Sequence, residues 1–315
     1  MGSRRRRRRG ILHGVPPPDS PDLVALDRFL VGSPPLAPDG RVLSWSGPDA
    51  FPYDESTALL ARHYAWADQP SRKRHLVAVL EQRVATCGGL ERDGLVYAFD
   101  TALALPVLGD GRPTALRTVL ALLDSRAAAA PLESADRWSR AFAPHLLKAF
   151  ASLRPEERSP ALTLAFRELA RETQEGGGFR SHPEHPGIYV HAHCYATEGL
   201  WALEGTSEAV RRAVDWLADH QEADGGLPAW VNAPSDRRPA DAVAQAARLF
   251  AIVDPSRHAR QLERALGRLA ALQDPVTGGI RYIEGGPHVN VWASIFAHQA
   301  TRLGRRLAAP TQSLV

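Results

Sequence analysis

The chain has 315 residues and a mass of 34.3 kDa, and 44% of its residues are hydrophobic. This composition predicts a globular protein with a sizeable core and excludes a disordered chain. The net charge of +3 depends on the six arginines of residues 4–9, so the pI of about 9.1 does not indicate a nucleic-acid-binding face on the folded part.

The first 20 residues differ in composition from the rest of the chain. The arginine run is followed by glycines and by three prolines at residues 16–18. Such a segment cannot build a core, so we predict a solvated tail, and no apolar stretch of signal-peptide or membrane-spanning length follows it. The two cysteines, Cys87 and Cys194, fall in different parts of the chain, which predicts no disulfide framework and a reducing, cytoplasmic setting.

Helical signals begin at Ser20, a capping residue followed by proline in the first turn, and predict a short helix over residues 21–30. Apolar periodicity then predicts helices over residues 54–66, 70–84, 96–108, 113–126, 134–152 and 160–174. These helices fall into two alternating classes. One class is apolar nearly all round, and the other is amphipathic and rich in arginine and glutamate.

A punctuated repeat follows this alternation. The last three amphipathic helices end in glutamine, at Gln174, Gln221 and Gln273, and a Gly-Gly-apolar triplet comes after each one. An apolar helix is predicted after each triplet, over residues 190–203, 239–252 and 289–303. The glycines supply the left-handed residue that ends a helix. The glutamine amides can bond the free backbone groups of an adjacent helix end.

This array predicts an all-α fold, an (α/α)6 toroid with a double ring of helices. Six apolar helices form the inner circle, because helices with neighbours on both sides must be apolar all round, and the amphipathic helices form the outer circle. The helix at 21–30 would be the sixth outer helix and would close the ring. We expect one domain over residues 21–308, with tails at 1–20 and 309–315. Only residues 188–190 and 279–283 resemble strands.

The repeat also resembles a known motif. Arg212, Trp216, Gln221 and Gly225 stand at the spacing of the QW motif of triterpene cyclases, with Leu227 where that motif ends in tryptophan. Residues 264–273 give a second, partial copy without the aromatic residue. The chain therefore resembles the α/α toroids of the terpenoid cyclase and protein prenyltransferase superfamily. Because these are scaffold motifs, the resemblance implies the fold more strongly than the function.

The catalytic motifs of that superfamily are absent. Its class II cyclases protonate an alkene with an Asp-x-Asp-Asp motif, and other members bind diphosphate through Asp-Asp-x-x-Asp, but this chain has no Asp-Asp pair. A single carboxylate with a raised pKa can still act as an acid, and Asp100, Glu198 and Asp241 lie on apolar helices where burial would raise the pKa. His191 and His193 are candidates for general acid or base catalysis near neutral pH.

The resemblance to protein prenyltransferases raises the alternative of a zinc site. Cys194 stands at the cysteine of their zinc motif, but Ala192 occupies the position of the aspartate. His193 and His288 are the other residues that would complete a Cys/His set. We predict no cofactor, with zinc on Cys194, His193 and His288 as the alternative.

We expect the site at the end of the ring where loops lead into the inner helices. An apolar-walled pocket with a few polar groups suits a small molecule, and arginines near it suit an anionic group on the substrate. The loops also bring Tyr53, Asp54 and Glu55 to this end. The predicted substrate-binding residues are Tyr97, Arg140, Arg180, Tyr189, Tyr195, Trp230, Arg281, Tyr282, His288, Asn290 and Trp292.

Three functions are compatible with these residues. The first is an enzyme of small-molecule metabolism that performs acid/base chemistry on a partly apolar, partly anionic substrate. The second is a carbohydrate epimerase, lyase or hydrolase, because similar helical barrels serve such enzymes and the loops carry many aromatic residues. The third is a non-catalytic binding or partner subunit. We prefer the first, with no membrane span and no nucleic acid as ligand.

Overall fold

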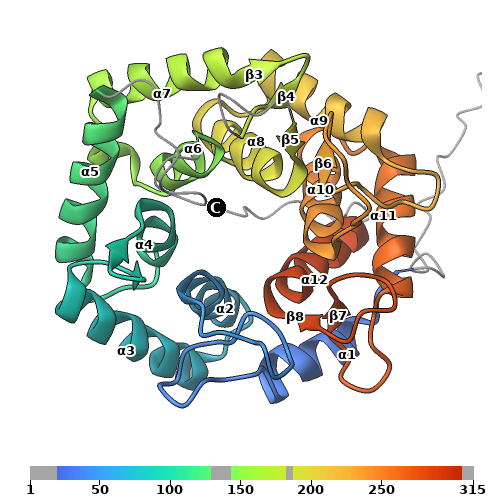
Figure 1. Ribbon diagram of the computed structural model, residues 1–315, viewed down its shortest axis with the longest axis horizontal. Helices are drawn as coiled ribbons and strands as arrows, with labels where there is room; N and C mark the ends of the chain where they lie inside the picture. Colours follow the sequence, from blue (N-terminus) through green and yellow to red (C-terminus); the bar gives the residue numbers. More distant parts are fainter. Residues whose placement is uncertain (1–19, 129–142, 182–186, 307–315) are drawn as a thin grey trace, which may run out of the picture.

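A computed structural model describes residues 20–128, 143–181 and 187–306, and the tails predicted at 1–20 and 309–315 fall almost wholly outside this part. Its helices form two concentric rings (Figure 1). The inner ring consists of α2 (Asp54–Trp66), α4 (Ala98–Ala104), α6 (Ala143–Ala151), α8 (Val190–Glu204), α10 (Ala240–Val253) and α12 (Val291–Arg306). The outer ring consists of α3 (Pro70–Cys87), α5 (Arg112–Ala128), α7 (Pro160–Thr173), α9 (Glu208–His220), α11 (Ala259–Ala271) and α1 (Leu23–Asp27), which a π-helical turn extends over Arg28–Gly32. The predicted all-α toroid is confirmed.

The inner ring is closed on itself. Each inner helix packs against the next one, and α12 packs against α2. The burial follows the predicted classes, since α10 is buried nearly all round whereas α9 buries one stripe consisting of Val210, Ala213, Val214, Trp216 and Leu217. Among the described residues no helix has the length and apolar character needed to span a membrane.

The repeat glutamines connect successive outer helices. The Nε2 groups of Gln174 and Gln221 donate hydrogen bonds to the backbone carbonyls of Ala209 at 2.9 Å and Gln261 at 3.0 Å, in the first turns of α9 and α11. Gln273 repeats this bond with the carbonyl of Asp22, at 3.0 Å, and also accepts a bond from the Asp22 backbone N–H at 2.8 Å. The first helix of the chain therefore completes the outer ring, as the repeat predicts.

Removal of the Gln273 amide should loosen this closure. We expect Gln273→Ala to lower the free energy of unfolding by about 1–3 kcal/mol, because bonds to Asp22 are lost and its backbone N–H is left without its acceptor. The same substitution at Gln82, an exposed residue of α3, should change it by less than about 0.5 kcal/mol. Urea unfolding measures both, and equal losses would argue against a role of Gln273 in closure.

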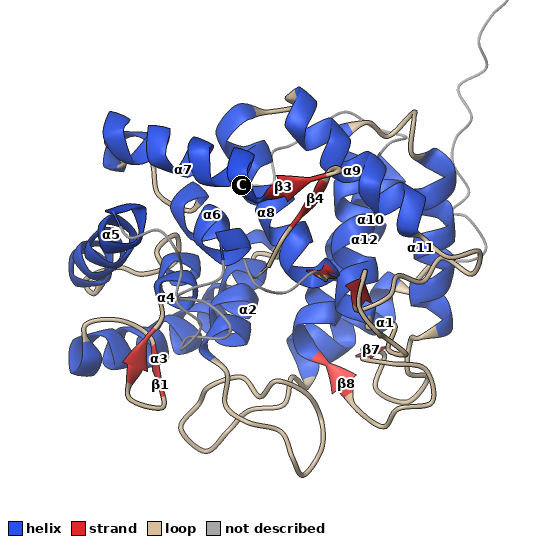
Figure 2. Ribbon diagram, turned by 45° about the horizontal axis from the view of Figure 1, so that its top comes forward, coloured by secondary structure: helices blue, strands red, loops and turns tan. Residues whose placement is uncertain are grey.

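Short two-stranded antiparallel sheets lie at the end of the toroid where the inner helices begin (Figure 2). The strands are β1 (Glu91–Arg92) with β2 (Leu95–Val96), β3 (Gln174–Glu175) with β4 (Gly178–Phe179), β5 (Ile188–Tyr189) with β6 (Trp230–Val231), and β7 (Ile280–Arg281) with β8 (Val289–Asn290). The two strand candidates at 188–190 and 279–283 are confirmed. The first hairpin and the hairpin of β3 and β4 were not predicted, although the Asp93-Gly94 turn of the first, with φ of 55° and 78°, is a strong hairpin signal.

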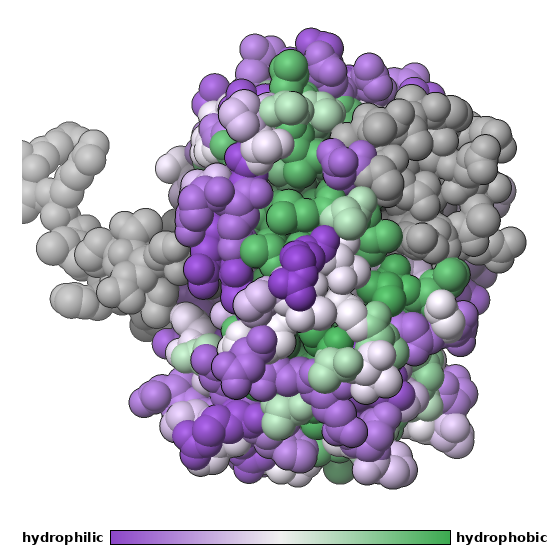
Figure 3. All heavy atoms as spheres, turned by 90° about the vertical axis from the view of Figure 1, so that its left-hand side faces the viewer, coloured by the Kyte–Doolittle hydropathy of each residue, from purple (hydrophilic) through white to green (hydrophobic). Residues whose placement is uncertain are grey.

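The outer helix α5 buries one face, as its sequence predicts, but some leucines of that face are incompletely covered. Val119 and Leu123 are buried, but Leu116, Leu120 and Leu122 are only partly buried. The space-filling view of this side of the ring shows apolar side chains at the surface between hydrophilic ones (Figure 3). The predicted apolar helix at 134–152 is described only from Ala143 onward.

Candidate functional site

The end where the inner helices begin carries a carboxylate held by tyrosines. Glu55, in the first turn of α2, accepts hydrogen bonds from the hydroxyls of Tyr53 and Tyr195. The two O–H donors hold this carboxyl group in place from two sides. Tyr195 comes from α8 on the other side of the ring, so this contact crosses the toroid axis.

Asp100, in the first turn of α4, lies next to this charge. Burial raises the pKa of the Asp100 carboxyl well above its usual range, the charge of Glu55 raises it further, and Arg92 opposes both effects. Only 4% of the residue is exposed, and no described residue forms a hydrogen bond with its carboxyl group. The carboxyl therefore keeps its proton at pH values where an ordinary aspartate has lost it. The predicted pKa rise is confirmed for Asp100.

A second group of polar side chains lies on α8, α10 and α12. His191 Nδ1 is 3.3 Å from Asp241 Oδ2, and the same oxygen accepts a hydrogen bond from Trp292 Nε1 at 3.1 Å. The Asp241 carboxyl is thereby oriented toward the imidazole. His145, on α6, lies 6.5 Å from the His191 ring, and burial lowers its pKa well below the usual value, so it stays neutral.

Aromatic side chains line the same end of the ring. The rings of Tyr189 and Trp230 are stacked with their centroids 4.9 Å apart, and the ring centroids of Tyr282 and Trp292 lie 6.3 Å apart. The guanidinium of Arg92 lies 4.7 Å from the ring of Tyr97 and 5.5 Å from that of Tyr53. Arg92 was not predicted as a site residue, because it belongs to the unpredicted first hairpin.

Several predicted binding residues have other roles. Arg281 forms an ion pair with Asp274 at 2.7 Å, and Arg180 lies 3.4 Å from Glu175, so carboxylates already neutralise both arginines. Asn290 is fully buried and its Oδ1 accepts a bond from the Ala293 backbone at the start of α12, which is a capping role. His288 lies at the rim, 3.2 Å from the Ser46 carbonyl. Arg140 lies outside the described residues.

His193 is a structural residue, which corrects its prediction as a catalytic one. Its Nδ1 accepts from the Phe179 backbone N–H at 3.0 Å, and its Nε2 lies 3.1 Å from the Ala213 carbonyl. These partners fix a neutral tautomer with the proton on Nε2. The ring is fully buried against Trp216 and β4, where burial lowers its pKa to about 3.

The buried His193 should make the fold sensitive to acid. An unfolded histidine takes up a proton near pH 6.5, whereas the folded one does so only at about pH 3, so the free energy of unfolding falls as the pH decreases through this window. Between these two pKa values His193 should lower the free energy of unfolding by about 1.4 kcal/mol for each pH unit of decrease. Urea unfolding from pH 7 to 5 should show a shallower decline for His193→Gln than for the wild type or for His75→Gln, an exposed control on α3. Parallel declines would contradict this assignment.

The structure does not assemble the alternative zinc set. Cys194 is fully buried and burial raises its pKa, so it stays a thiol, while both ring nitrogens of His193 face backbone groups. His288 lies at the rim with Ser46 and Asp49. Within the described part of the chain, the one group of three ligand side chains whose atoms lie within 4.8 Å of one another is a different set, Asp27, His63 and His298.

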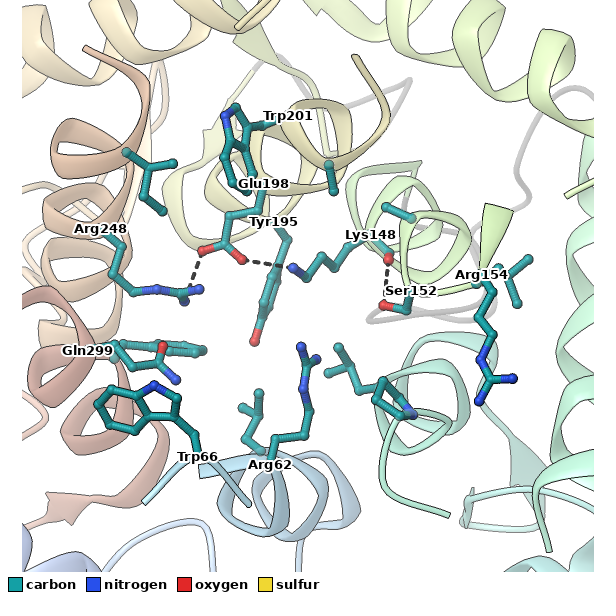
Figure 4. Close-up of a pocket in the computed structure, with 18 of the residues that line it drawn as sticks. Arg62, Trp66, Lys148, Ser152, Arg154, Tyr195, Glu198, Trp201, Arg248 and Gln299 are labelled. Carbon is teal, nitrogen blue, oxygen red and sulfur yellow. Dashed lines mark hydrogen bonds and ion pairs between the residues drawn. The ribbon is translucent and has the colours of Figure 1, made fainter. Parts of the chain in front are cut away.

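A cavity of about 470 Å³ opens at the other end of the toroid, where the inner helices end (Figure 4). Its lining includes apolar side chains such as Trp66, Trp201 and Phe296. It also includes six basic side chains and one carboxylate, namely Arg62, Arg112, Lys148, Arg154, Arg158, Arg248 and Glu198. We call this cavity the basic pocket.

Glu198 lies in the basic pocket, not with Asp100, and its predicted pKa rise is wrong. It forms ion pairs with Lys148 at 3.2 Å and Arg248 at 3.0 Å (Figure 4). Burial alone raises the pKa of the carboxyl, but the two cations outweigh it and lower the pKa below its usual value. Glu198 is therefore ionised and is a poor proton donor. Tyr195 separates the two ends, because its ring lines the basic pocket and its hydroxyl binds Glu55.

Sequence comparison finds no matching family model and no matching curated protein. Structure comparison finds toroids. A variant of the type II terpene cyclase MstE from Scytonema, in complex with the substrate geranylgeranyl dihydroxybenzoate, matches with a TM-score of 0.63 and 17% identity over 90% of this chain and 95% of its own.

Two carbohydrate-acting enzymes have the same architecture. An α-amylase from Clostridium perfringens matches with a TM-score of 0.67 and 12% identity over 89% of this chain and 97% of its own. An unsaturated glucuronyl hydrolase specific for heparin matches with a TM-score of 0.62 and 12% identity, over 90% and 95%. The chain thus has the terpenoid-cyclase-like α/α toroid fold, which these carbohydrate-acting proteins share.

Proposed function

We propose that the chain is an enzyme that protonates a partly apolar, partly anionic small molecule, with Asp100 as the proton donor. The observation that carries the proposal is the buried carboxyl group of Asp100, which lies beside the Glu55 carboxylate at the aromatic end of the toroid and has no hydrogen bond from the described residues. Protonation of an alkene needs an acid that is not ionised at the working pH. It also needs walls that tolerate a positive charge, which aromatic faces do.

Glu55 has two roles in this proposal. Its charge helps to keep the proton on Asp100 in the resting enzyme. Tyr53 and Tyr195, which donate to it, hold it in place and restrict its contact with the substrate. After Asp100 gives up its proton, the neighbouring Arg92 stabilises the carboxylate that forms.

The anionic group of the substrate would bind to arginines at the same end. Arg92 lies over Tyr53 and Tyr97, and Arg237 is exposed near Tyr189 and Tyr282. Neither guanidinium forms an ion pair with a described carboxylate, in contrast to Arg180 and Arg281. These two replace the predicted arginines as candidates for anion recognition.

Geranylgeranyl dihydroxybenzoate, the substrate of MstE, is the first probe because it joins a hydrocarbon chain to a benzoate. Incubation in D₂O should yield a cyclised isomer with one carbon-bound deuterium, because the donated proton exchanges with solvent before transfer. Mass spectrometry and NMR of the product measure this. Cyclisation without deuterium uptake would contradict protonation by the enzyme. Asp100→Asn should abolish the deuterated product, and Asp124→Asn, at an exposed residue of α5, is the matched control for this variant.

A second candidate is a carbohydrate-acting enzyme, favoured by the His191, Asp241 and Trp292 group. An imidazole oriented by a carboxylate suits proton abstraction next to a uronate, and stacked aromatic rings suit a sugar face. The probe is a saturated heparin disaccharide, because its uronate still carries the proton at C5 that the imidazole would abstract. Turnover of this disaccharide that His191→Gln abolishes and Asp100→Asn leaves intact would favour this candidate over alkene protonation.

A further inference from the structure

The basic pocket holds more positive charge than its own residues neutralise. Among the described residues, Glu198 is the one carboxylate that lines it, and it already pairs with both Lys148 and Arg248. Arg62 has no hydrogen bond or ion pair to any described residue, although its guanidinium points into the middle of the cavity (Figure 4). Burial and the charge of Arg248 lower the pKa of Arg62, and burial lowers that of Lys148. Burial of these two positive charges therefore costs free energy, and a bound anion would offset that cost.

The surroundings do not supply this counter-charge. Arg112 is neutralised by Glu157 at 2.7 Å, and Arg158 donates to the carbonyls of Ala151 and Leu153. Arg154 is exposed at the rim, and its side chain forms no ion pair with a described residue. The carbonyl ends of the inner helices offset part of the positive charge within their last turn. None of these backbone carbonyls accepts a hydrogen bond from Arg62.

We propose that the basic pocket is a second ligand site and that it takes a phosphate ester with a hydrocarbon substituent. Arg62 would bind the phosphate oxygens in the middle of the cavity, and Arg154 would contact them from the rim. Trp66, Trp201 and Phe296 would enclose the hydrocarbon. The volume of about 470 Å³ suits one small amphipathic molecule. This site is distinct from the one that contains Asp100.

Titration calorimetry with decyl phosphate, inorganic phosphate and pyrophosphate tests the proposal. We expect saturable 1:1 binding of decyl phosphate that weakens at high salt and weakens at least tenfold in Arg62→Gln. Arg211→Gln, at an exposed residue of α9, should bind within twofold of the wild type. Asp100→Asn should also bind normally, which separates this proposal from the proposed reaction.

The outcomes decide between sources of the phosphate. If inorganic phosphate and pyrophosphate bind as tightly as decyl phosphate, the hydrocarbon part of the proposal is wrong. No saturable binding of any of the three, or equal affinity in the wild type and Arg62→Gln, would overturn it altogether. Because Arg62 has no hydrogen-bond or ion-pair partner in the described part of the chain, its replacement should leave the fold intact. Arg154→Gln at the rim provides a second variant with the same expected direction.

A separate observation concerns Asp27, His63 and His298, which lie where the ring closes. They come from α1, α2 and α12, and their ligand atoms all lie within 4.8 Å of one another. His298 Nε2 is 2.8 Å from Asp27 Oδ1, and the two imidazole rings meet edge to face at 4.9 Å. Both rings are buried, and neither nitrogen of His63 has a hydrogen-bond partner among the residues that the structure describes.

Two neutral imidazoles and a carboxylate are ligands for a divalent transition metal. Both imidazoles are buried in contact with each other, and their nitrogens converge with an oxygen of Asp27. The charge of Arg302 acts on both rings and would oppose a bound cation, whereas the carboxylate of Asp27 would attract one. We infer that these three residues bind one Zn²⁺ ion, with water as a further ligand at the half-exposed Asp27.

Titration of chelator-treated protein with Zn²⁺, and with Co²⁺ followed by its visible absorption, tests this inference. We expect one ion per chain at the strongest site, with at least a hundredfold weaker binding in His298→Gln and in His63→Gln. His75→Gln, at an exposed histidine, should leave this site unchanged. Unaltered Zn²⁺ binding in both His298→Gln and His63→Gln, or the absence of a strong site in the wild type, would contradict the inference.

Discussion

Replacement of Asp100 by asparagine should reduce turnover about 10²- to 10⁴-fold, because a carboxamide of the same shape cannot donate the proton. The loss should appear in kcat, and the variant should be no less stable than the wild type. The substitution removes an acid that is buried beside Glu55, so its unfolding free energy should stay equal or rise. Steady-state kinetics and urea unfolding measure the two effects. Asp124→Asn should change neither.

The pH profile gives an independent readout of the same residue. Asp100 must be protonated to act as the acid, so kcat/KM should be high below its raised pKa and fall as the pH increases through that value. Glu55→Gln removes the neighbouring negative charge and should move this decline to lower pH. A profile that Glu55→Gln leaves in place would show that another group controls the reaction.

Replacement of Gly278 by alanine should destabilise the toroid at its closure. Gly278 has a φ of +81°, and an added Cβ would lie 2.4 Å from the carbonyl oxygen of Ala25 in α1. This contact is with backbone, so no side-chain rotation relieves it. We expect a loss of about 3 kcal/mol or more in the free energy of unfolding, from the strained φ together with the displacement of α1.

Gly285→Ala is the matched control for this prediction. Its φ is +69°, but a Cβ there would meet no atom within 4 Å, so only the backbone strain of about 1 kcal/mol remains. Urea unfolding of the two variants isolates the contact with α1. Equal losses at Gly278 and Gly285 would mean that α1 does not press against this glycine in solution.

Most of the fold could be predicted from the sequence repeats. Gln221 and Gln273 repeat at the ends of amphipathic helices, and the structure shows each of them bonded to the start of the next outer helix. Apolar character all round α10 and one-sided character in α9 distinguished the two rings. In α5 the sequence predicted the buried face, but not how incompletely Leu116 and Leu120 on that face are covered.

The candidate site was predicted only in part. Asp100, His191 and Asp241 lie in the first turns of inner helices, so the predicted fold places them at the same end of the toroid. His193, two residues from His191, points to the outer ring instead, because a helix turns by about 200° over two residues. The pKa of Glu198 depended on Lys148 and Arg248, single residues far apart in sequence that only the closed ring brings together. The same holds for His63 and His298.

Infrared spectroscopy of the carboxyl groups tests the protonated state of Asp100 most directly, without a substrate. In the difference spectrum between the wild type and Asp100→Asn at pH 7, we expect the C=O stretching band of a protonated carboxylic acid, which disappears as the pH is raised. A difference spectrum that shows only the bands of an ionised carboxylate at pH 7 would contradict the assignment of Asp100 as the acid.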